Sequence, residues 1–88
     1  MKAKTSFKGH EIEFNRSLAE FTLSVDGEVL DQKKGSLKNH KVDTILEAVI
    51  DKGSNSGATL RAELSLGLFT DKVTFYWNNE QIAQKKIL

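Results

Sequence analysis

Hydrophobic and polar residues alternate along most of this chain, which is the pattern of β-strands that bury one face. Residues 10–14 (HEIEF) place an isoleucine and a phenylalanine on one face and two glutamates on the other. Residues 58–69 (ATLRAELSLGLF) alternate over the longest stretch, and we expect them to form the longest inward-facing strand, Leu68 included. The parity of the apolar positions reverses at Gly9, after residues 3–7, which predicts a glycine bulge within one strand.

Residues 21–34 resemble residues 73–86 at an offset of 52 positions. The first segment reads FTLSVDGEVLDQKK and the second reads VTFYWNNEQIAQKK. The dipeptides DG (26–27) and NN (78–79) occupy the same place in the two segments, and both suit the positive-φ turn of a two-residue hairpin. An internal repeat of this kind indicates an architecture built from related halves.

The repeat extends upstream when the same offset is kept, which matches Ile12 with Leu64. We therefore predict a single domain over residues 1–88, with an internal repeat of residues 5–34 and 57–86. A chain of this length buries about 60–65% of its unfolded surface, which is enough for one small core.

The segment KVDTILEAVIDK (41–52) fits two structures. As a helix it has apolar residues at i, i+3, i+4, i+7 and i+8, and Gly53 would be the C′ residue just past the end of the helix. As a strand it alternates, and its β-branched residues favour this interpretation. The predicted fold is all-β, a single antiparallel β-sandwich or meander of about six to seven strands built from two related halves. The alternative is an α+β fold with one short helix at about 41–52.

Residues 28–34 and 80–87 contain paired lysines, and we expect both to form edge strands, where lysine discourages further strand addition. The predicted core takes the apolar faces of all the strands. It comprises Phe7, Ile12, Phe14, Phe21, Leu23, Val25, Leu30, Leu46, Ile50, Leu60, Leu64, Leu66, Phe75, Trp77 and Ile82.

The composition favours a soluble globular domain and excludes functions that need cysteine. The chain has 88 residues, of which 39% are hydrophobic and 28% charged, and these fractions are typical of a soluble globular domain. It has no cysteine, which removes disulfides, thiolate catalysis and cysteine metal sites. The net charge of +1 gives no strong attraction to nucleic acid or to anionic membranes, and no apolar run approaches the roughly 20 residues of a membrane span. We expect a cytoplasmic protein without a membrane partner.

No residue pattern predicts catalysis. His10 and His40 lie in different contexts, and neither has the companions that a zinc site needs. Glu11 and Glu13 share one face of a strand, where a solvated surface explains them better than glycoside chemistry does. No serine lies in a G-x-S-x-G elbow. We expect a protein that is not an enzyme and that has no catalytic residues, no cofactor and no metal.

Two features indicate an interaction surface. The first is a basic cluster in the connection at 33–41, formed by Lys33, Lys34, Lys38 and Lys41. Such a cluster can contact phosphates, although the scarcity of arginine makes nucleic acid an unlikely partner. The second feature is Tyr76, which faces away from the core side of its strand and suits a protein interface.

The repeat unit resembles that of the Fas apoptotic inhibitory molecule family. The resemblance rests on HEIEF (10–14) and VDGE (25–28) in the first half, and on GLF (67–69) and WNNEQI (77–82) in the second. It implies compact domains of antiparallel β-hairpin repeats and a role in protein interaction and regulation without enzymatic activity. It carries no functional residues over to this chain.

The leading hypothesis is therefore a small non-enzymatic protein-interaction module with an unidentified protein partner. A homo-oligomeric structural unit is one alternative. A domain that binds a small ligand or nucleic acid through the Lys33–Lys41 basic loop is the other.

Overall fold

Eight antiparallel strands make up the protein in a computed structural model that describes residues 1–34 and 44–87. The strands are β1 (Lys2–Phe7), β2 (His10–Arg16), β3 (Glu20–Val25), β4 (Glu28–Lys34), β5 (Thr44–Val49), β6 (Thr59–Ser65), β7 (Lys72–Trp77) and β8 (Glu80–Lys86). The all-β prediction is confirmed. The count exceeds the expected six to seven because Lys8 and Gly9 form a turn that separates β1 from β2, where the sequence suggested a bulge in one strand.

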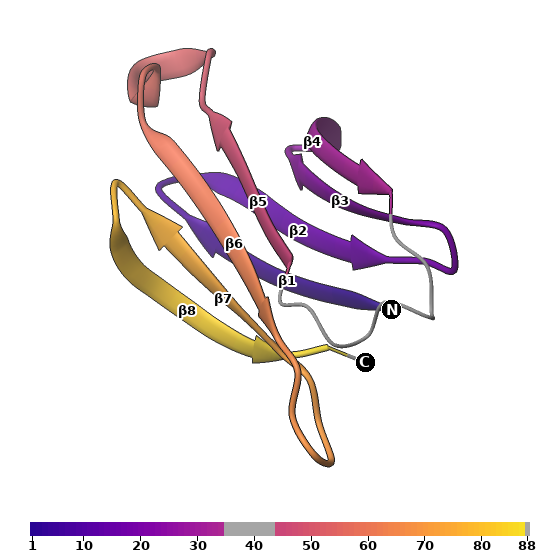
Figure 1. The fold of residues 1–88 in the computed structure, drawn as a ribbon. Coiled ribbons are helices and arrows are strands. Elements are labelled where there is room, and N and C mark those ends of the chain that lie inside the picture. The colour runs from indigo at the N-terminus through magenta and orange to yellow at the C-terminus, as the bar shows by residue number, and fades with distance from the viewer. Residues whose placement is uncertain (35–43, 88) are drawn as a thin grey trace.

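The strands form two sheets that pack face to face (Figure 1). The first sheet has the order β1-β2-β3-β4 and the second has the order β5-β6-β7-β8, so each sheet is a simple meander. At the two sides of the sandwich, β4 lies beside β5 and β1 lies beside β8. The molecule measures 40 × 21 × 19 Å.

The segment with two interpretations is a strand where the structure describes it. Residues Thr44–Val49 pair with β6 in antiparallel register, and residues 41–43 lie outside the described part. The connection that follows contains a short 3-10 helix, η2 (Gly53–Asn55). Within residues 1–34 and 44–87, no helix has the length and apolar character needed to cross a membrane.

The two halves share details that go beyond strand order. The turn residues Asp26 and Asn78 both have positive φ, at 52° and 49°, as a two-residue hairpin of this handedness requires. Each turn side chain also accepts a backbone N–H from the neighbouring hairpin. The Asp26 carboxylate accepts that of Glu11 at 2.9 Å, and the Asn78 amide oxygen accepts that of Thr59 at 2.9 Å.

An identical irregularity follows each turn. The register between β3 and β4 shifts between Leu23 and Ser24, and the register between β7 and β8 shifts between Phe75 and Tyr76. These positions are 52 residues apart, which is the offset of the sequence repeat. A β-bulge at the same place in both halves shows that they follow one structural plan.

The offset is smaller upstream, which corrects the predicted match of Ile12 with Leu64. In the structure Ile12 pairs with Val25, and Leu60 pairs with Trp77. Ile12 is therefore the counterpart of Leu60, at an offset of 48. The difference from 52 means that the connection between β6 and β7 is longer than its counterpart in the first half.

Every residue of the predicted core is buried or packs against the buried cluster. The largest fully buried side chains come from both sheets, with Phe14 and Leu23 from the first and Phe75 and Leu60 from the second. Four further buried hydrophobic residues lie outside the predicted core: Ala3, Ala62, Val73 and Ile87. All four are small or β-branched side chains, and they belong to the same buried cluster as the larger core residues.

Candidate functional site

The β6–β7 connection is longer than its counterpart in the first half. Between the last equivalent strand pairs, Arg16–Phe21 and Leu64–Val73, the chain has four residues in the first half and eight in the second. The extra length projects as a narrow hairpin from one end of the sandwich (Figure 1). We call residues 66–71 the β6–β7 tip.

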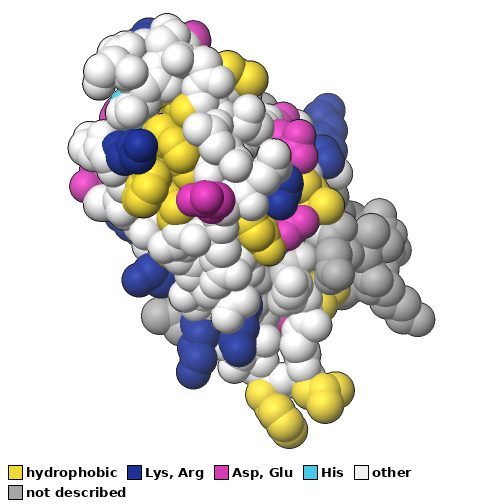
Figure 2. Space-filling model, turned by 90° about the vertical axis from the view of Figure 1, so that its left-hand side faces the viewer, with side chains coloured by type: hydrophobic (Ala, Val, Ile, Leu, Met, Phe, Trp, Pro, Cys, Tyr) yellow, Lys and Arg dark blue, Asp and Glu magenta, His cyan; other side chains and the backbone are white. Residues whose placement is uncertain are grey.

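The tip carries the two most exposed large apolar side chains of the described residues. Leu68 is 96% exposed and Phe69 is 98% exposed. Figure 2 shows hydrophobic side chains projecting at the lower end of the molecule, with Lys and Arg side chains gathered just above them. Single exposed apolar residues are common, but two adjacent ones on a projecting hairpin concentrate apolar surface where it can reach a partner.

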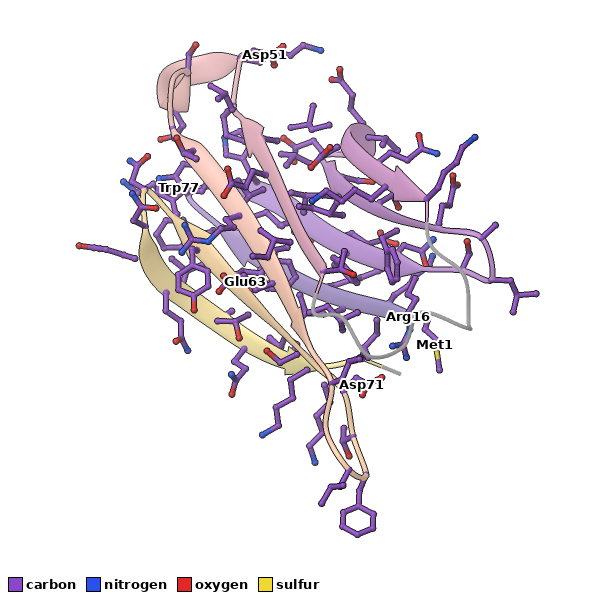
Figure 3. All side chains as sticks on the ribbon, in the orientation of Figure 1. Met1, Arg16, Asp51, Glu63, Asp71 and Trp77 are labelled. Carbon is purple, nitrogen blue, oxygen red and sulfur yellow. The ribbon has the colours of Figure 1, made fainter. Side chains whose placement is uncertain are left out.

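The base of the tip is held in a defined conformation. A Cβ at Gly67 would lie 2.3 Å from the carbonyl oxygen of Thr70, so only glycine fits without a rearrangement of the turn. The N–H of Gly67 donates to the Asp71 carboxylate at 3.2 Å, and that carboxylate also pairs with Arg16 of β2 at 2.7 Å. Figure 3 shows Asp71 at the root of the hairpin with Arg16 beside it. The tip is thus joined to the first sheet.

Three exposed lysines surround the base of the tip. Lys72 begins β7 and lies directly opposite Lys86 in β8, and Lys85 is the cross-strand neighbour of Val73. In the described part of the chain, no carboxylate forms an ion pair with any of these three lysines. We call Lys72, Lys85 and Lys86 the basic collar.

Tyr76, the predicted interface residue, lies on the outer face of the second sheet. The Arg61 guanidinium lies 4.3 Å from its ring centroid, which is a cation–π geometry. A hydrogen bond to the Glu63 carboxylate, followed by partial loss of solvation, raises the pKa of the Tyr76 phenol. These contacts occupy the polar parts of Tyr76 within its own sheet.

The predicted basic cluster is only partly within the described residues. Lys33 donates a hydrogen bond from its ammonium to the carbonyl oxygen of Ile45, and the neighbouring Asp31 carboxylate accepts the N–H of Glu47 at 2.9 Å. Side chains of β4 therefore satisfy backbone groups of β5 where the two sheets meet. Lys34 is exposed at the end of β4. Lys38 and Lys41, like His40, lie outside the described residues.

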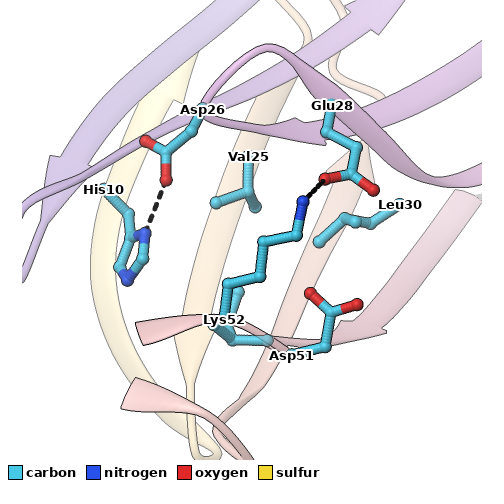
Figure 4. A pocket seen from close by; sticks show the side chains of 8 residues that line it. His10, Val25, Asp26, Glu28, Leu30, Asp51 and Lys52 are labelled. Atoms are coloured by element: carbon cyan, nitrogen blue, oxygen red, sulfur yellow. Dashed lines mark hydrogen bonds and ion pairs between the residues drawn. The ribbon is translucent and has the colours of Figure 1, made fainter. Parts of the chain in front are cut away.

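A small pocket at the opposite end of the sandwich is the other candidate site (Figure 4). Its volume is about 120 Å³. The His10 ring lies 2.7 Å from the Asp26 carboxylate through Nδ1 and 3.2 Å from the Asn55 amide through Nε2. Lys52 pairs with Glu28 across the pocket at 3.0 Å.

The pocket residues bind one another and connect the two halves. Asn55 belongs to the β5–β6 connection, whereas His10 and Asp26 belong to the first sheet. The backbone N–H of Glu11 and then the His10 contact lower the pKa of Asp26. No serine, threonine or cysteine is among the lining residues, so the pocket has no hydroxyl or thiol nucleophile. Its geometry supports a structural role.

The described residues contain no group of three or more His, Cys, Asp and Glu side chains that could bind a metal ion. Comparison of the chain with models of known protein families, with curated proteins and with solved structures finds no match. The resemblance to the Fas apoptotic inhibitory molecule family therefore stays a prediction.

The tip is not evident from the alternating pattern, which continues past the end of β6. The pattern predicts Leu66 and Leu68 on one inward-facing strand, but β6 ends at Ser65, and of the two leucines only Leu66 packs against the core. A signal was present in the repeat. The dipeptide Ser17-Leu18 recurs as Ser65-Leu66 at an offset of 48, and the offset becomes 52 after Thr70. A gapped comparison of the halves would have located four additional residues, 67–70.

Proposed function

We propose that the protein is a small non-enzymatic interaction module that docks onto a larger partner through the β6–β7 tip. The observation that carries this proposal is the nearly complete exposure of Leu68 and Phe69 on a projecting hairpin. Burial of a leucine or phenylalanine side chain contributes about 1.5–3 kcal/mol, so the tip offers a substantial binding energy that folding leaves unused.

Folding alone does not require the tip. The first half closes the equivalent connection with four fewer residues and reaches the same strand pairing beyond it. Glycine at position 67 and the Asp71–Arg16 contact then hold the longer connection in a fixed orientation. A rigid projection with an apolar end lowers the entropy cost of binding, because little of it must be ordered on contact.

The alternatives have less support. Ligand pockets typically have volumes of about 300–1,000 Å³. The His10 pocket, at about 120 Å³, and a second pocket beside Lys4 and Glu11, at about 230 Å³, are both smaller. The nucleic-acid alternative depends on Lys33, which bonds to a backbone carbonyl, and on residues outside the described part. A homo-oligomer remains an alternative that one measurement of mass by light scattering would test.

Site-specific photo-cross-linking tests the proposal. Phe69→benzoylphenylalanine keeps an aromatic side chain at the tip, and Val49→benzoylphenylalanine places the same probe on β5 at the other end of the sandwich. In a cell extract that retains its membranes, we expect adducts from position 69 and none above background from position 49. Equal labelling from both positions, or no adduct from position 69, would show that the tip is not the docking site.

A further inference from the structure

The apolar part of the tip is small. A specific protein–protein interface buries about 800 Å² on each partner and involves roughly 20–30 residues a side. The tip offers two adjacent apolar side chains, Leu68 and Phe69, on a hairpin only two strands wide. A fluid surface suits such a feature better than a rigid one, because it closes around a projection without a matching cavity.

Among the described residues, lysines predominate at the base of the tip. The basic collar contributes three exposed lysines, Lys72, Lys85 and Lys86. Asp71 is the acidic residue of the tip itself, and Arg16 neutralises it at 2.7 Å. Like charges directly opposite each other, as Lys72 and Lys86 are, disfavour folding. A partner with negative charge would relieve this repulsion.

The distance between the apolar end of the tip and the basic collar matches the distance between the acyl chains and the phosphates of a bilayer. Phe69 and Lys72 are three positions apart in the chain, so their Cα atoms are at most about 11 Å apart. Apolar side chains of surface-bound proteins lie about 5–10 Å into the boundary between headgroups and acyl chains. When Phe69 reaches that depth, the collar lies at the level of the phosphates, where lysine extends its ammonium toward them.

We propose that the docking partner of the tip is an anionic lipid bilayer, in which Leu68 and Phe69 insert while the basic collar contacts the headgroups. This inference rests on the proposed function and names its partner. From the net charge of +1 we expected no attraction to anionic membranes. The structure changes that expectation for one end of the molecule, because it gathers three lysines around an apolar tip.

Co-sedimentation with vesicles tests the inference. The probes are vesicles of phosphatidylcholine alone and vesicles that contain 30% phosphatidylserine. We expect the protein to bind the anionic vesicles and to bind the neutral ones at least tenfold more weakly. Each lysine near an anionic surface strengthens binding about fivefold, so Lys85→Gln with Lys86→Gln should weaken binding about 25-fold.

Matched variants distinguish the contribution of the tip to vesicle binding from that of exposed apolar side chains elsewhere. Leu68→Ser with Phe69→Ser should weaken binding to the anionic vesicles at least tenfold. Val29→Ser with Val49→Ser removes two other exposed apolar side chains, 52% and 59% exposed, at the opposite end, and should change binding less than twofold. Far-ultraviolet circular dichroism and the emission of Trp77 verify that each variant is folded.

Two results would overturn the inference. One is a wild-type protein that does not bind the anionic vesicles, and the other is binding that survives the Leu68 and Phe69 substitutions. If vesicles fail but position 69 still cross-links selectively to a protein, the tip remains a docking site and its partner is that protein. If position 69 gives no adduct of either kind, the proposed function fails as well.

Discussion

Substitutions at Asn78 test whether both halves depend on the same turn chemistry. Asn78 supplies two properties, tolerance of a φ of 49° and an amide oxygen that accepts the N–H of Thr59 at 2.9 Å. Asn78→Gly keeps the backbone conformation and loses the hydrogen bond, which is worth about 1 kcal/mol. Asn78→Ala loses the bond and also places a Cβ in the left-handed region, at a further cost of about 1–2 kcal/mol.

Asn78→Asp is the matched control, because the first half uses aspartate at this position for the same contact. We expect it to change the free energy of unfolding by less than about 0.5 kcal/mol, since both properties of the turn are kept. A loss of 1 kcal/mol lowers the Tm of a domain of this size by about 4–8 °C. The expected order of stability is therefore wild type, Asn78→Asp, Asn78→Gly and Asn78→Ala.

Urea unfolding measures this series directly. Trp77 is the single tryptophan of the chain and is only 5% exposed, so its emission reports the unfolding of the adjacent turn and the core. If Asn78→Asp were as destabilising as Asn78→Ala, the two halves would not share this turn chemistry. The same conclusion would follow if Asn78→Ala left the free energy of unfolding within about 0.5 kcal/mol of the wild type, which is the size of an ordinary surface substitution.

Two further predictions concern the core and pH. Leu64→Asp should unfold the domain because it buries an unpaired charge. Glu63→Lys, on the outer face, loses the contacts of Glu63 with Tyr76 and Arg61 and should cost only about 1–2 kcal/mol. Circular dichroism and urea unfolding compare the two variants, and the opposite order would mean that the strand faces are reversed. The hydrogen bond from the Glu11 N–H, and then the contact with His10, lower the pKa of Asp26 from its ordinary value of 3.8. The ionised Asp26 therefore stabilises the folded state above pH 3.8, and this stabilisation is lost as the pH falls through the lowered pKa. Asp26→Asn should make the acid loss of stability shallower in urea titrations from pH 7 to 2, and an unchanged pH profile would contradict this.

Much of the fold follows from local pattern. Alternation places Ile12, Phe14 and Leu64 on inner faces, and these residues are buried. The paired dipeptides at 26–27 and 78–79 mark two hairpin turns, which the structure has. Both signals are local, because side-chain parity and turn conformation are set by a few neighbouring residues.

The rest depends on how distant segments pack. The contacts of Lys33 and Asp31 with β5 arise only where the two sheets meet, so the sequence suggested a free basic cluster instead. The tip was hidden because Leu66 and Leu68 continue the alternating pattern, although only the first packs against the core. Burial of such positions depends on whether another strand covers them, and parity carries no information about that.

The most direct test of the central claim is deletion of residues 67–70, which gives the second half a connection as short as that of the first. We expect a folded protein, with a Tm within a few degrees of the wild type, that no longer binds vesicles containing 30% phosphatidylserine. An unfolded deletion variant would contradict the claim that these four residues are dispensable for folding. A folded variant with unchanged vesicle binding would contradict the claim that they form the docking site.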